Sequence, residues 1–205
     1  MSCSLEQEDR LRAGGIARVA GIDEAGRGAL AGPVVAAAVV LPDGFHHARL
    51  DDSKRLSARL RADLYTELTS DPRIHWAVAM REPLEIDRIN ILRATHAAMR
   101  DAAEALPDPP QHVLIDGLPV EPFPFPQTAL VGGDGISFSI AAASVLAKVT
   151  RDRILERLDA AHPGYGFAVH KGYATRSHVA ILHSRGPSPV HRRSFSPVAQ
   201  GDFGF

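Results

Sequence analysis

The sequence predicts an α/β fold: a single domain with a mixed β-sheet flanked by helices. Strand-like and helix-like segments alternate along the chain after an antiparallel start, which is typical of a sheet covered by helices. Of the 205 residues, 45% are hydrophobic and 23% are charged, close to the average of globular domains. Since no low-complexity linker divides the chain, we expect one domain over residues 17–198, between an N-terminal tail (1–16) and a C-terminal tail (199–205).

The domain is expected to begin with two strands joined by a glycine-rich turn. Residues 18–22, apolar after Arg18, and residues 34–41 are typical of strands, and glycines recur in the turn at 26–32. The second run is apolar on both faces, which predicts a strand in the interior of the sheet. Residues 43–56 have no regular pattern, and we expect a loop there.

Helices and strands then alternate along the rest of the domain. Ser57 is a suitable N-cap for a helix in which leucine recurs at every fourth position. The prolines at 107–110 end a long helix, because proline cannot continue one. The expected elements, in order, are a helix from Ser57, a strand at 75–80, a helix at 84–106, strands at 113–115 and 128–131, a helix at 136–160 and a short helix at 175–183.

Carboxylates stand at three expected strand ends. Asp23 and Glu24 follow the first strand, Asp116 ends a short apolar strand, and Asp134 lies in a Gly-Asp-Gly turn before the long helix. Taken alone, each is also typical of an ordinary turn, since Asp-Gly is a common turn pair. Together they are more informative, because open α/β sheets collect functional groups at strand ends. Oxygen ligands with few competing His or Cys favour Mg²⁺ or Mn²⁺, so the sequence predicts a site for such cations.

The adjacent pair Asp23 and Glu24 raises a geometric question. Successive side chains of a strand point to opposite faces. Both acids can therefore serve one site only if the chain leaves regular geometry at Gly26, or if one of them contributes its backbone carbonyl. The sequence leaves these alternatives open.

A second group of candidates is suited to binding anions. Glycines in Gly26-Arg27-Gly28 allow backbone N–H groups to approach a ligand closely. Tyr173 follows a Lys-Gly pair, which places an aromatic ring beside a cation, as on a nucleic-acid contact surface. The alternative for Tyr173 is a core residue whose hydroxyl reaches the surface, and for each lysine it is a solvated charge. The basic candidates for phosphate contacts are Lys54, Lys148, Lys171 and Arg193.

The net charge of −1 conceals an uneven distribution. Residues 1–139 carry a balance of −6, and residues 140–205 carry +5. Such a chain could hold metal ions at its acidic part and a polyanion at its basic part. The alternative explanation is that charged residues are distributed unevenly over solvent-exposed helices without any function.

A series of short motifs occurs in a fixed order over about residues 18–198. They are GIDEAGRG at 21–28, DSK at 52–54, NI at 90–91, LIDG at 114–117, GD at 133–134, SIAAASVLAKVTRD at 139–152, YGF at 165–167, HKGY at 170–173 and HRRSF at 191–195. No single motif is decisive, but the ordered set resembles type 2 ribonuclease H, ribonuclease HII.

The resemblance implies an RNase H-like fold and a metal-dependent endonuclease that acts on RNA hybridised to DNA and on single ribonucleotides embedded in duplex DNA. It also implies cleavage with two Mg²⁺ or Mn²⁺ ions, giving 3′-hydroxyl and 5′-phosphate ends. The four acids of the family fall on Asp23, Glu24, Asp116 and Asp134. Its junction-reading elements fall on Gly26, Arg27, Gly28 and Tyr173. In one departure, a Lys often precedes the Gly-Asp pair, where this chain has Gly132.

Two other functions remain possible from the residues. One is a different carboxylate nuclease of the same fold, such as a junction resolvase or an integrase-like enzyme, which would cut an all-DNA substrate. The other is a non-catalytic module that binds RNA–DNA hybrids. The four acids disfavour the second, because a mere binder has no reason to place carboxylates near phosphates.

We expect a monomeric, soluble, cytoplasmic protein. The acidic N-terminus has no apolar segment typical of a secretory signal, no apolar run is long enough for a membrane helix, and the single cysteine excludes an internal disulfide. The end of the chain, Gln200 to Phe205, resembles the short peptides that dock on DNA sliding clamps, since a Gln precedes two aromatic residues. The alternative is that these aromatic side chains fold back onto the domain or are disordered.

Overall fold

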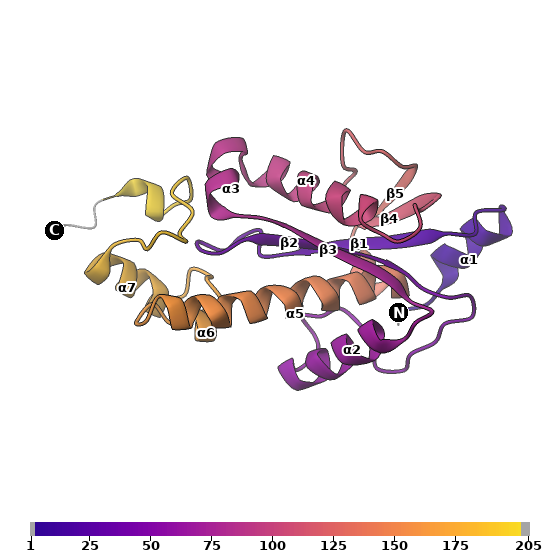
Figure 1. Cartoon of the computed structure of the whole chain (residues 1–205), viewed down its shortest axis with the longest axis horizontal. Coiled ribbons are helices and arrows are strands. Elements are labelled where there is room, and N and C mark those ends of the chain that lie inside the picture. Colours follow the sequence, from indigo (N-terminus) through magenta and orange to yellow (C-terminus); the bar gives the residue numbers. More distant parts are fainter. Residues whose placement is uncertain (1–2, 202–205) are drawn as a thin grey trace.

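A five-stranded sheet lies at the centre of the computed structural model, which describes residues 3–201 (Figure 1). The strands are β1 (Val19–Ala25), β2 (Val34–Val40), β3 (His75–Arg81), β4 (His112–Asp116) and β5 (Gln127–Leu130). Their order is β3-β2-β1-β4-β5. The β1–β2 and β2–β3 pairs are antiparallel, whereas β1–β4 and β4–β5 are parallel. The expected mixed sheet is confirmed.

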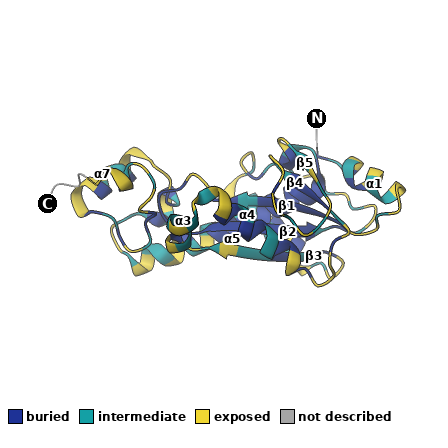
Figure 2. Ribbon diagram, turned by 90° about the horizontal axis from the view of Figure 1, so that it is seen from above, coloured by how far each residue is buried: buried dark blue, intermediate teal, exposed yellow. Residues whose placement is uncertain are grey.

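Helices cover both faces of this sheet. Helix α4 packs on β2 and β3 from one side, and α5 packs on β1 and β2 from the other (Figure 1). Strands β1, β2 and β4 are mostly buried, whereas the edge strands β3 and β5 are only partly buried. The outward faces of the helices are exposed (Figure 2). The helices are α1 (Glu6–Ala13), α2 (Ala58–Ser70), α3 (Pro83–Ile89), α4 (Ile91–Glu104), α5 (Phe138–Ala161), α6 (Phe167–His170) and α7 (Arg176–Arg185), with short 3₁₀ turns η1 (Gly133–Gly135) and η2 (Val198–Gln200).

Strand β2 contributes to two separate cores, one on each face. Val35, Ala37 and Val39 lie in the core that includes α5 and α2, whereas Ala36 and Ala38 lie in the core that includes α4. Both sets are completely buried. A strand covered on both faces needs apolar residues at every position, which explains the continuous run in the sequence and confirms its interior position.

The start of helix α5 lies directly against β1. The Ser137 side chain caps the helix by accepting a hydrogen bond from Ile140 N, as an N-cap serine should. A Cβ atom on Gly21 would lie 2.1 Å from the carbonyl carbon of Ser139. Glycine at this position therefore allows the two backbones to touch, and it places the beginning of α5 beside the strand that carries Asp23.

The prediction of one long helix at 84–106 is wrong in one respect, because the segment forms two helices, α3 and α4. Asn90 separates α3 from α4 with a φ of 68° and a ψ of 163°. Its side-chain Oδ1 accepts a hydrogen bond from Arg93 N, at 3.0 Å, and so caps α4. The apolar spacing continues across the break, which is why periodicity alone suggested one helix.

Within the segment expected as an N-terminal tail, residues 6–13 form helix α1. Glu8 on this helix is fully buried although it is an acid. Residues 4 and 137 form an isolated parallel β-bridge, so the segment lies alongside the start of α5.

The C-terminal segment forms a small layer beyond the end of the sheet (Figure 1). Three histidine rings lie together there with Phe167: His170 stacks on His178 at 4.0 Å between ring centroids, and His178 Nε2 lies 3.0 Å from His191 Nε2. All three histidines are buried. The segment after Pro187, expected to be irregular, contains η2 as its one short element among the described residues.

Two fully buried arginines attach this layer to the glycine-rich turn after β1. Arg151 donates to the carbonyls of Pro33, Ala31 and Lys171, and Arg192 donates to those of Gly32 and Arg27. These nitrogens are paired, as a buried charge requires, but Arg192 Nη2 is buried with no hydrogen-bond partner among the described residues. These contacts fix the turn and the segment around Tyr173 relative to each other.

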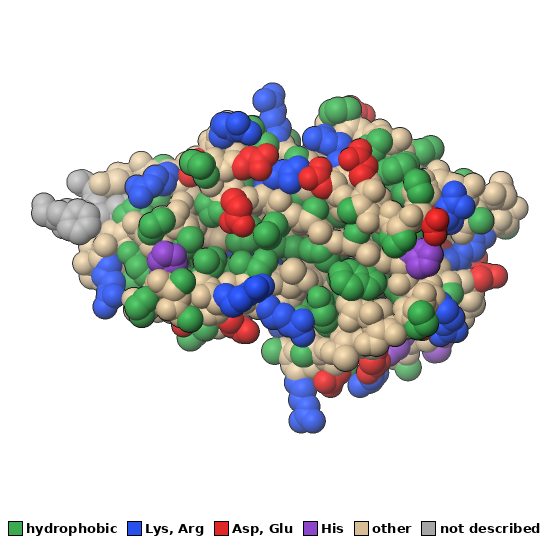
Figure 3. Space-filling model, in the orientation of Figure 1, with side chains coloured by type: hydrophobic (Ala, Val, Ile, Leu, Met, Phe, Trp, Pro, Cys, Tyr) green, Lys and Arg blue, Asp and Glu red, His purple; other side chains and the backbone are tan. Residues whose placement is uncertain are grey.

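The surface over α3 and α4 carries interspersed acidic and basic side chains, as on a solvated face (Figure 3). None of the helices in the described residues is long and apolar enough to cross a membrane. The expected clamp-binding segment begins in η2 at Gln200, but Phe203 and Phe205 lie outside the described residues.

Candidate active site

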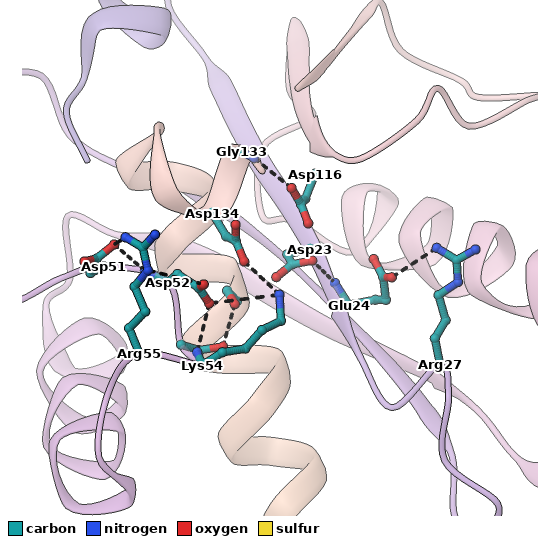
Figure 4. Close-up of polar contacts among 12 residues, drawn as sticks. Asp23, Glu24, Arg27, Asp51, Asp52, Lys54, Arg55, Asp116, Gly133 and Asp134 are labelled. Atoms are coloured by element: carbon teal, nitrogen blue, oxygen red, sulfur yellow. Dashed lines mark hydrogen bonds and ion pairs between the residues drawn. The ribbon is translucent and has the colours of Figure 1, made fainter. Parts of the chain in front are cut away.

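Three carboxylates from separate elements converge at one end of the sheet. Asp23 comes from β1, Asp116 from β4 and Asp134 from η1. One oxygen of each lies within 4.8 Å of the others, and their carboxylates face one another (Figure 4). Asp23 and Asp134 are only 3% and 5% exposed.

Strand pairing and backbone hydrogen bonds set this geometry. β1 and β4 are parallel with Ile22 opposite Ile115, so the acids that follow those two residues point to the same face. Asp116 Oδ1 accepts a hydrogen bond from Gly133 N at 2.8 Å, which ties β4 to the turn that carries Asp134.

The cluster is electrostatically unfavourable without a cation. Burial, together with the charges of Glu24 and Asp116, raises the pKa of Asp23 well above its ordinary value. The pKa of Asp116 is also raised, by burial and then by the charge of Asp134. Clustered, buried carboxylates are stabilised by bound metal ions, and an all-oxygen donor set fits a hard divalent cation. The residues present therefore fit Mg²⁺ or Mn²⁺.

Asp23 and Glu24 lie inside β1, not after it, since the strand continues to Ala25. The alternation of a regular strand therefore separates their side chains. Glu24 points toward Arg27, with Oε1 3.5 Å from Nη1 (Figure 4). Burial raises the pKa of Glu24 despite the opposing charge of Arg27. The structure thus keeps the Glu24 side chain beside the three-carboxylate cluster but out of it.

The carboxylates open into a cavity of about 210 Å³. The Tyr173 ring, 37% exposed, lies at this cavity with Lys148 Nζ 5.7 Å and the Arg151 guanidinium 5.4 Å from its centroid. Asp134 is not among the lining residues but meets Lys54 at the edge of the cavity. The lining residues are Asp23, Glu24, Ala25, Gly26, Arg27, Gly28, Ser53, Lys54, Asp116, Ser144, Lys148 and Tyr173.

Two of the basic candidates lie elsewhere. Lys171 does not line the cavity, and its Nζ pairs with Glu156 Oε1 on α5 at 2.7 Å. Arg193 also lies outside the cavity, where its backbone N–H donates to Asp87. Gly132 has a φ of 70°, with open space around the position of a Cβ, so a lysine side chain would have room there but a strained backbone.

Sequence reasoning missed two serines in the cavity. Ser53 Oγ and Ser144 Oγ lie 2.7 Å apart and join the Asp-Ser-Lys loop to α5. A hydrogen bond from Ser144 partly offsets the raised pKa of Asp23. Both stand in motifs already singled out, Ser53 in the segment 52–54 and Ser144 in the segment 139–152, but neither motif indicates by itself which of its serines faces the cavity.

Comparison with known proteins agrees with this geometry. A model of the ribonuclease HII family matches residues 20–198. A ribonuclease HII from Geobacter sulfurreducens is 51% identical over 193 residues, which cover 94% of this chain and 88% of that protein. The structure is similar to ribonuclease H2 from Pyrococcus horikoshii, with a TM-score of 0.70 and 25% identity over 89% of this chain and 96% of that one. It is similar also to a structure of the PCNA:RNase HII complex from Archaeoglobus fulgidus, with a TM-score of 0.71 and 26% identity over 87% and 95% of the two chains.

The family match covers most of the chain, including the strands that carry Asp23 and Asp116 and the turn that carries Asp134. The fold is that of the ribonuclease H2 structures, as the resemblance of the motifs implied. The chain therefore belongs to the ribonuclease HII family and is a metal-dependent ribonuclease H that acts on RNA–DNA hybrids.

Proposed function

We propose that this ribonuclease H also cuts on the 5′ side of single ribonucleotides embedded in duplex DNA, and that it leaves 3′-hydroxyl and 5′-phosphate ends. The observation that carries the proposal is one shared cavity. Two acids of the metal cluster line it together with Gly26, Arg27, Gly28 and Tyr173. A group that hydrolyses phosphodiesters and a group suited to reading a sugar are thus close enough to act on one nucleotide.

The cluster is proposed to hold two divalent cations. Asp23 and Asp116 are the central ligands, because they are adjacent in register on parallel strands. Asp134 would complete the shell of the second ion or position the water, and Glu24 would contribute a ligand by its side chain or its backbone carbonyl. When bound, such ions would activate the attacking water and stabilise the leaving 3′-oxygen. The identity of the ion, Mg²⁺ or Mn²⁺, is not distinguished by an oxygen donor set.

Recognition of the ribonucleotide requires a reader of its 2′-hydroxyl, the group that separates RNA from DNA. The backbone of Gly26 to Gly28 is suited to this, because it lines the cavity and glycine lets backbone groups approach a ligand closely. Packing also requires glycine at position 26, since a Cβ there would lie 1.9 Å from Arg151 Nε. The Tyr173 ring is suited to packing on the next deoxyribose. A 2′-hydroxyl at that second sugar would clash with the ring, which makes Tyr173 a sensor of the RNA–DNA junction.

The basic residues are proposed to hold the phosphate backbone without reading sequence. Lys54 and Lys148 line the cavity and would contact phosphates near the cut. Lys171 and Arg193 lie outside it and would contact the duplex further along. Lys148 and Lys171 are ion-paired with Asp152 and Glu156, so each must exchange a carboxylate for a phosphate.

The proposal extends to a clamp interaction, to the oligomeric state of the protein and to its location in the cell. We propose that the segment from Gln200 to Phe205 docks on a DNA sliding clamp; that a ribonuclease HII of similar structure, from Archaeoglobus fulgidus, forms a complex with PCNA supports an interaction of this kind. Comparing the full chain with one truncated after Val198 in a clamp titration tests it, and equal binding would reject it. We further propose that the enzyme acts in the cytoplasm as a monomer.

A cleavage assay on three duplexes tests the proposal. One carries a single embedded ribonucleotide, one is all DNA of the same sequence, and one is a continuous RNA–DNA hybrid. With Mg²⁺ or Mn²⁺, the first should be cut 5′ to the ribonucleotide and the second left intact. Cutting of the all-DNA duplex would favour a resolvase-like or integrase-like nuclease, and binding without cleavage under either metal would favour a hybrid-binding module.

A further inference from the structure

The N-terminal helix buries an acid against the start of α5. Glu8 is 0% exposed. Its Oε1 accepts three hydrogen bonds, from Ser137 Oγ at 2.6 Å, Ser139 N at 3.0 Å and Ser139 Oγ at 2.5 Å. A carboxylate at a helix N-terminus satisfies free N–H groups and interacts favourably with the helix dipole. Glu8 therefore fixes where α5 begins.

The residues just before Glu8 hold the turn that carries Asp134. Ser4 N donates to Ile136 O, and Phe138 N donates to Ser4 O, both at 3.0 Å. The Cys3 thiol donates to the carbonyl oxygen of Asp134 itself, at 3.2 Å. The N-terminal segment thus contacts the backbone at Asp134 and on its C-terminal side as far as Ser139.

These backbone contacts are important for metal binding, because the hydrogen bond that now holds the Asp134 side chain would be lost when a cation binds. Lys54 holds the Asp134 carboxylate, and a cation bound there would compete with Lys54. The orientation of Asp134 in the metal-loaded enzyme then depends on its backbone. Turn η1 has three residues and depends on its surroundings for rigidity.

The burial of Glu8 also has an energetic cost, because only one of its two carboxylate oxygens is hydrogen-bonded within the described part of the chain. Its second oxygen, Oε2, is buried and has no hydrogen-bond partner among the described residues. An unsatisfied buried polar atom is destabilising, and proteins tolerate such costs mainly where function requires them.

We propose that Glu8 is a positioning residue of the metal centre. Through Ser137 and Ser139 it fixes the start of α5, and with it the turn that directs Asp134 toward Asp23 and Asp116. The N-terminal segment is then part of the active enzyme and not an appendage. This inference rests on the proposed metal site at the three carboxylates.

Binding of Mn²⁺ to the full chain without substrate tests it, with free Mn²⁺ followed by electron paramagnetic resonance. The wild-type chain should bind two ions. Glu8→Ala should bind one of them normally and the other about tenfold more weakly, the low end of the effect of residues that orient ligands. Glu8→Gln should lie between them, because its amide oxygen accepts the same hydrogen bonds without the charge.

Glu6→Gln is the matched control. Glu6 is on the same helix, its side chain is 61% exposed, and it pairs with Arg10. This variant should titrate like the wild type. Ser139→Ala removes one donor to Glu8 from the α5 side and should weaken the same Mn²⁺ ion, which keeps the test available if Glu8→Ala does not fold.

The outcomes separate this inference from the proposed function. If the wild type binds two ions and Glu8→Ala, Glu8→Gln and Ser139→Ala bind them equally well, Glu8 is not a positioning residue, whatever happens to the melting temperature, and the metal site stands. If the wild-type chain binds no Mn²⁺, the metal site itself is wrong and the inference falls with it.

Discussion

Lys54 Nζ lies 3.0 Å from Asp134 Oδ2, although the lysine side chain is 74% exposed and the aspartate side chain only 7%. The lysine thus extends from the surface to place its charge at a buried acidic cluster. Burial alone would lower its pKa, but the hydrogen bond to Asp134 and the charges of Asp134, Asp52 and Asp23 together raise it. In the metal-free protein Lys54 offsets part of the charge that a cation would neutralise.

Lys54→Met should therefore lower the melting temperature of the metal-free protein and enlarge the gain in melting temperature on adding Mn²⁺. A ligand that binds only the folded state, at a concentration of a hundred times its Kd, stabilises that state by about 2.7 kcal/mol. The gain in melting temperature on adding Mn²⁺ should be larger for the variant than for the wild type. Thermal unfolding with chelator and with Mn²⁺ measures both. Lys148→Met is the control, since Lys148 pairs with Asp152 and not with the cluster; equal gains in all three proteins would contradict the role of Lys54.

The buried histidine pair should make the protein sensitive to acid. Burial lowers the pKa of His178 and of His191 from 6.5 to about 4. The unfolded chain takes up these protons first, so their stabilising contribution is complete above pH 6.5 and is lost as the pH falls toward 4. Each ring costs up to about 1.4 kcal/mol per pH unit in that range. The raised pKa of Asp23 acts in the opposite direction, because the folded state then binds its proton more tightly than the unfolded chain.

The comparison of His178→Gln with the wild type isolates the histidine effect. Urea unfolding at about pH 7.5 and about pH 5.5, on either side of the ordinary histidine pKa, gives the loss of unfolding free energy for each protein. The variant should lose about 1 kcal/mol less than the wild type between the two pH values. Parallel losses in the two proteins would show that His178 does not titrate on unfolding.

The break at Asn90 predicts an order of stabilities. Asn90→Ala loses the cap on α4 and keeps the Cβ that Asn90 already carries at positive φ, so it should cost about 0.5–2 kcal/mol. Asn90→Gly also loses the cap but relieves the backbone, so it should be about 1 kcal/mol more stable than the alanine variant. Denaturant unfolding measures both, and an alanine variant as stable as the glycine variant would contradict the role of backbone strain.

These elements show where sequence information is sufficient. The buried strand β2, the Ser57 cap and the proline-bounded end of α4 follow from local composition, and the structure agrees with each. The Asn90 break was not predictable from periodicity, because the apolar spacing continues across it. Helix α1 was missed because its residues are mostly polar and show no apolar periodicity, and its one buried residue, Glu8, is an acid.

The site shows the same division. The strand-end acids were predictable as a group, because parallel strands bring their carboxyl ends together. Where each long basic side chain lies was not predictable. Lys148 is oriented by Asp152 one turn further along α5, and Lys171, directly after α6, is oriented by Glu156 of α5. The separation of Glu24 from the cluster depends on β1 remaining regular to Ala25, which the acidic residues themselves do not suggest.

Tyr173 is predicted to matter most at a junction. Tyr173→Ala should lose about tenfold or more activity on a single embedded ribonucleotide, since packing of a ring on a nucleotide contributes about 1–3 kcal/mol, and it should lose less on a continuous hybrid. Tyr173→Phe keeps the ring and should retain most activity if packing is the important contact. Steady-state cleavage of both substrates by both variants measures this, and equal losses of Tyr173→Ala on the two substrates would assign the residue a structural role.

The acidic cluster carries the central claim, that hydrolysis takes place at cations held by Asp23, Asp116 and Asp134. Removing one charge from it should relieve repulsion, so Asp23→Asn should be more stable than the wild type without metal; a relief of even one pKa unit corresponds to about 1.4 kcal/mol. Asp43→Asn, whose side chain is 90% exposed, is a control for the loss of a single negative charge.

Cleavage of an RNA–DNA hybrid by Asp23→Asn at saturating Mg²⁺ tests that claim most directly, with hybrid binding measured on the same preparation. The account predicts that turnover is abolished while binding is kept or strengthened, because a negative charge near the phosphate is removed, and that Asp43→Asn behaves like the wild type. Near-normal turnover by Asp23→Asn would contradict the assignment of the three carboxylates as the catalytic metal site.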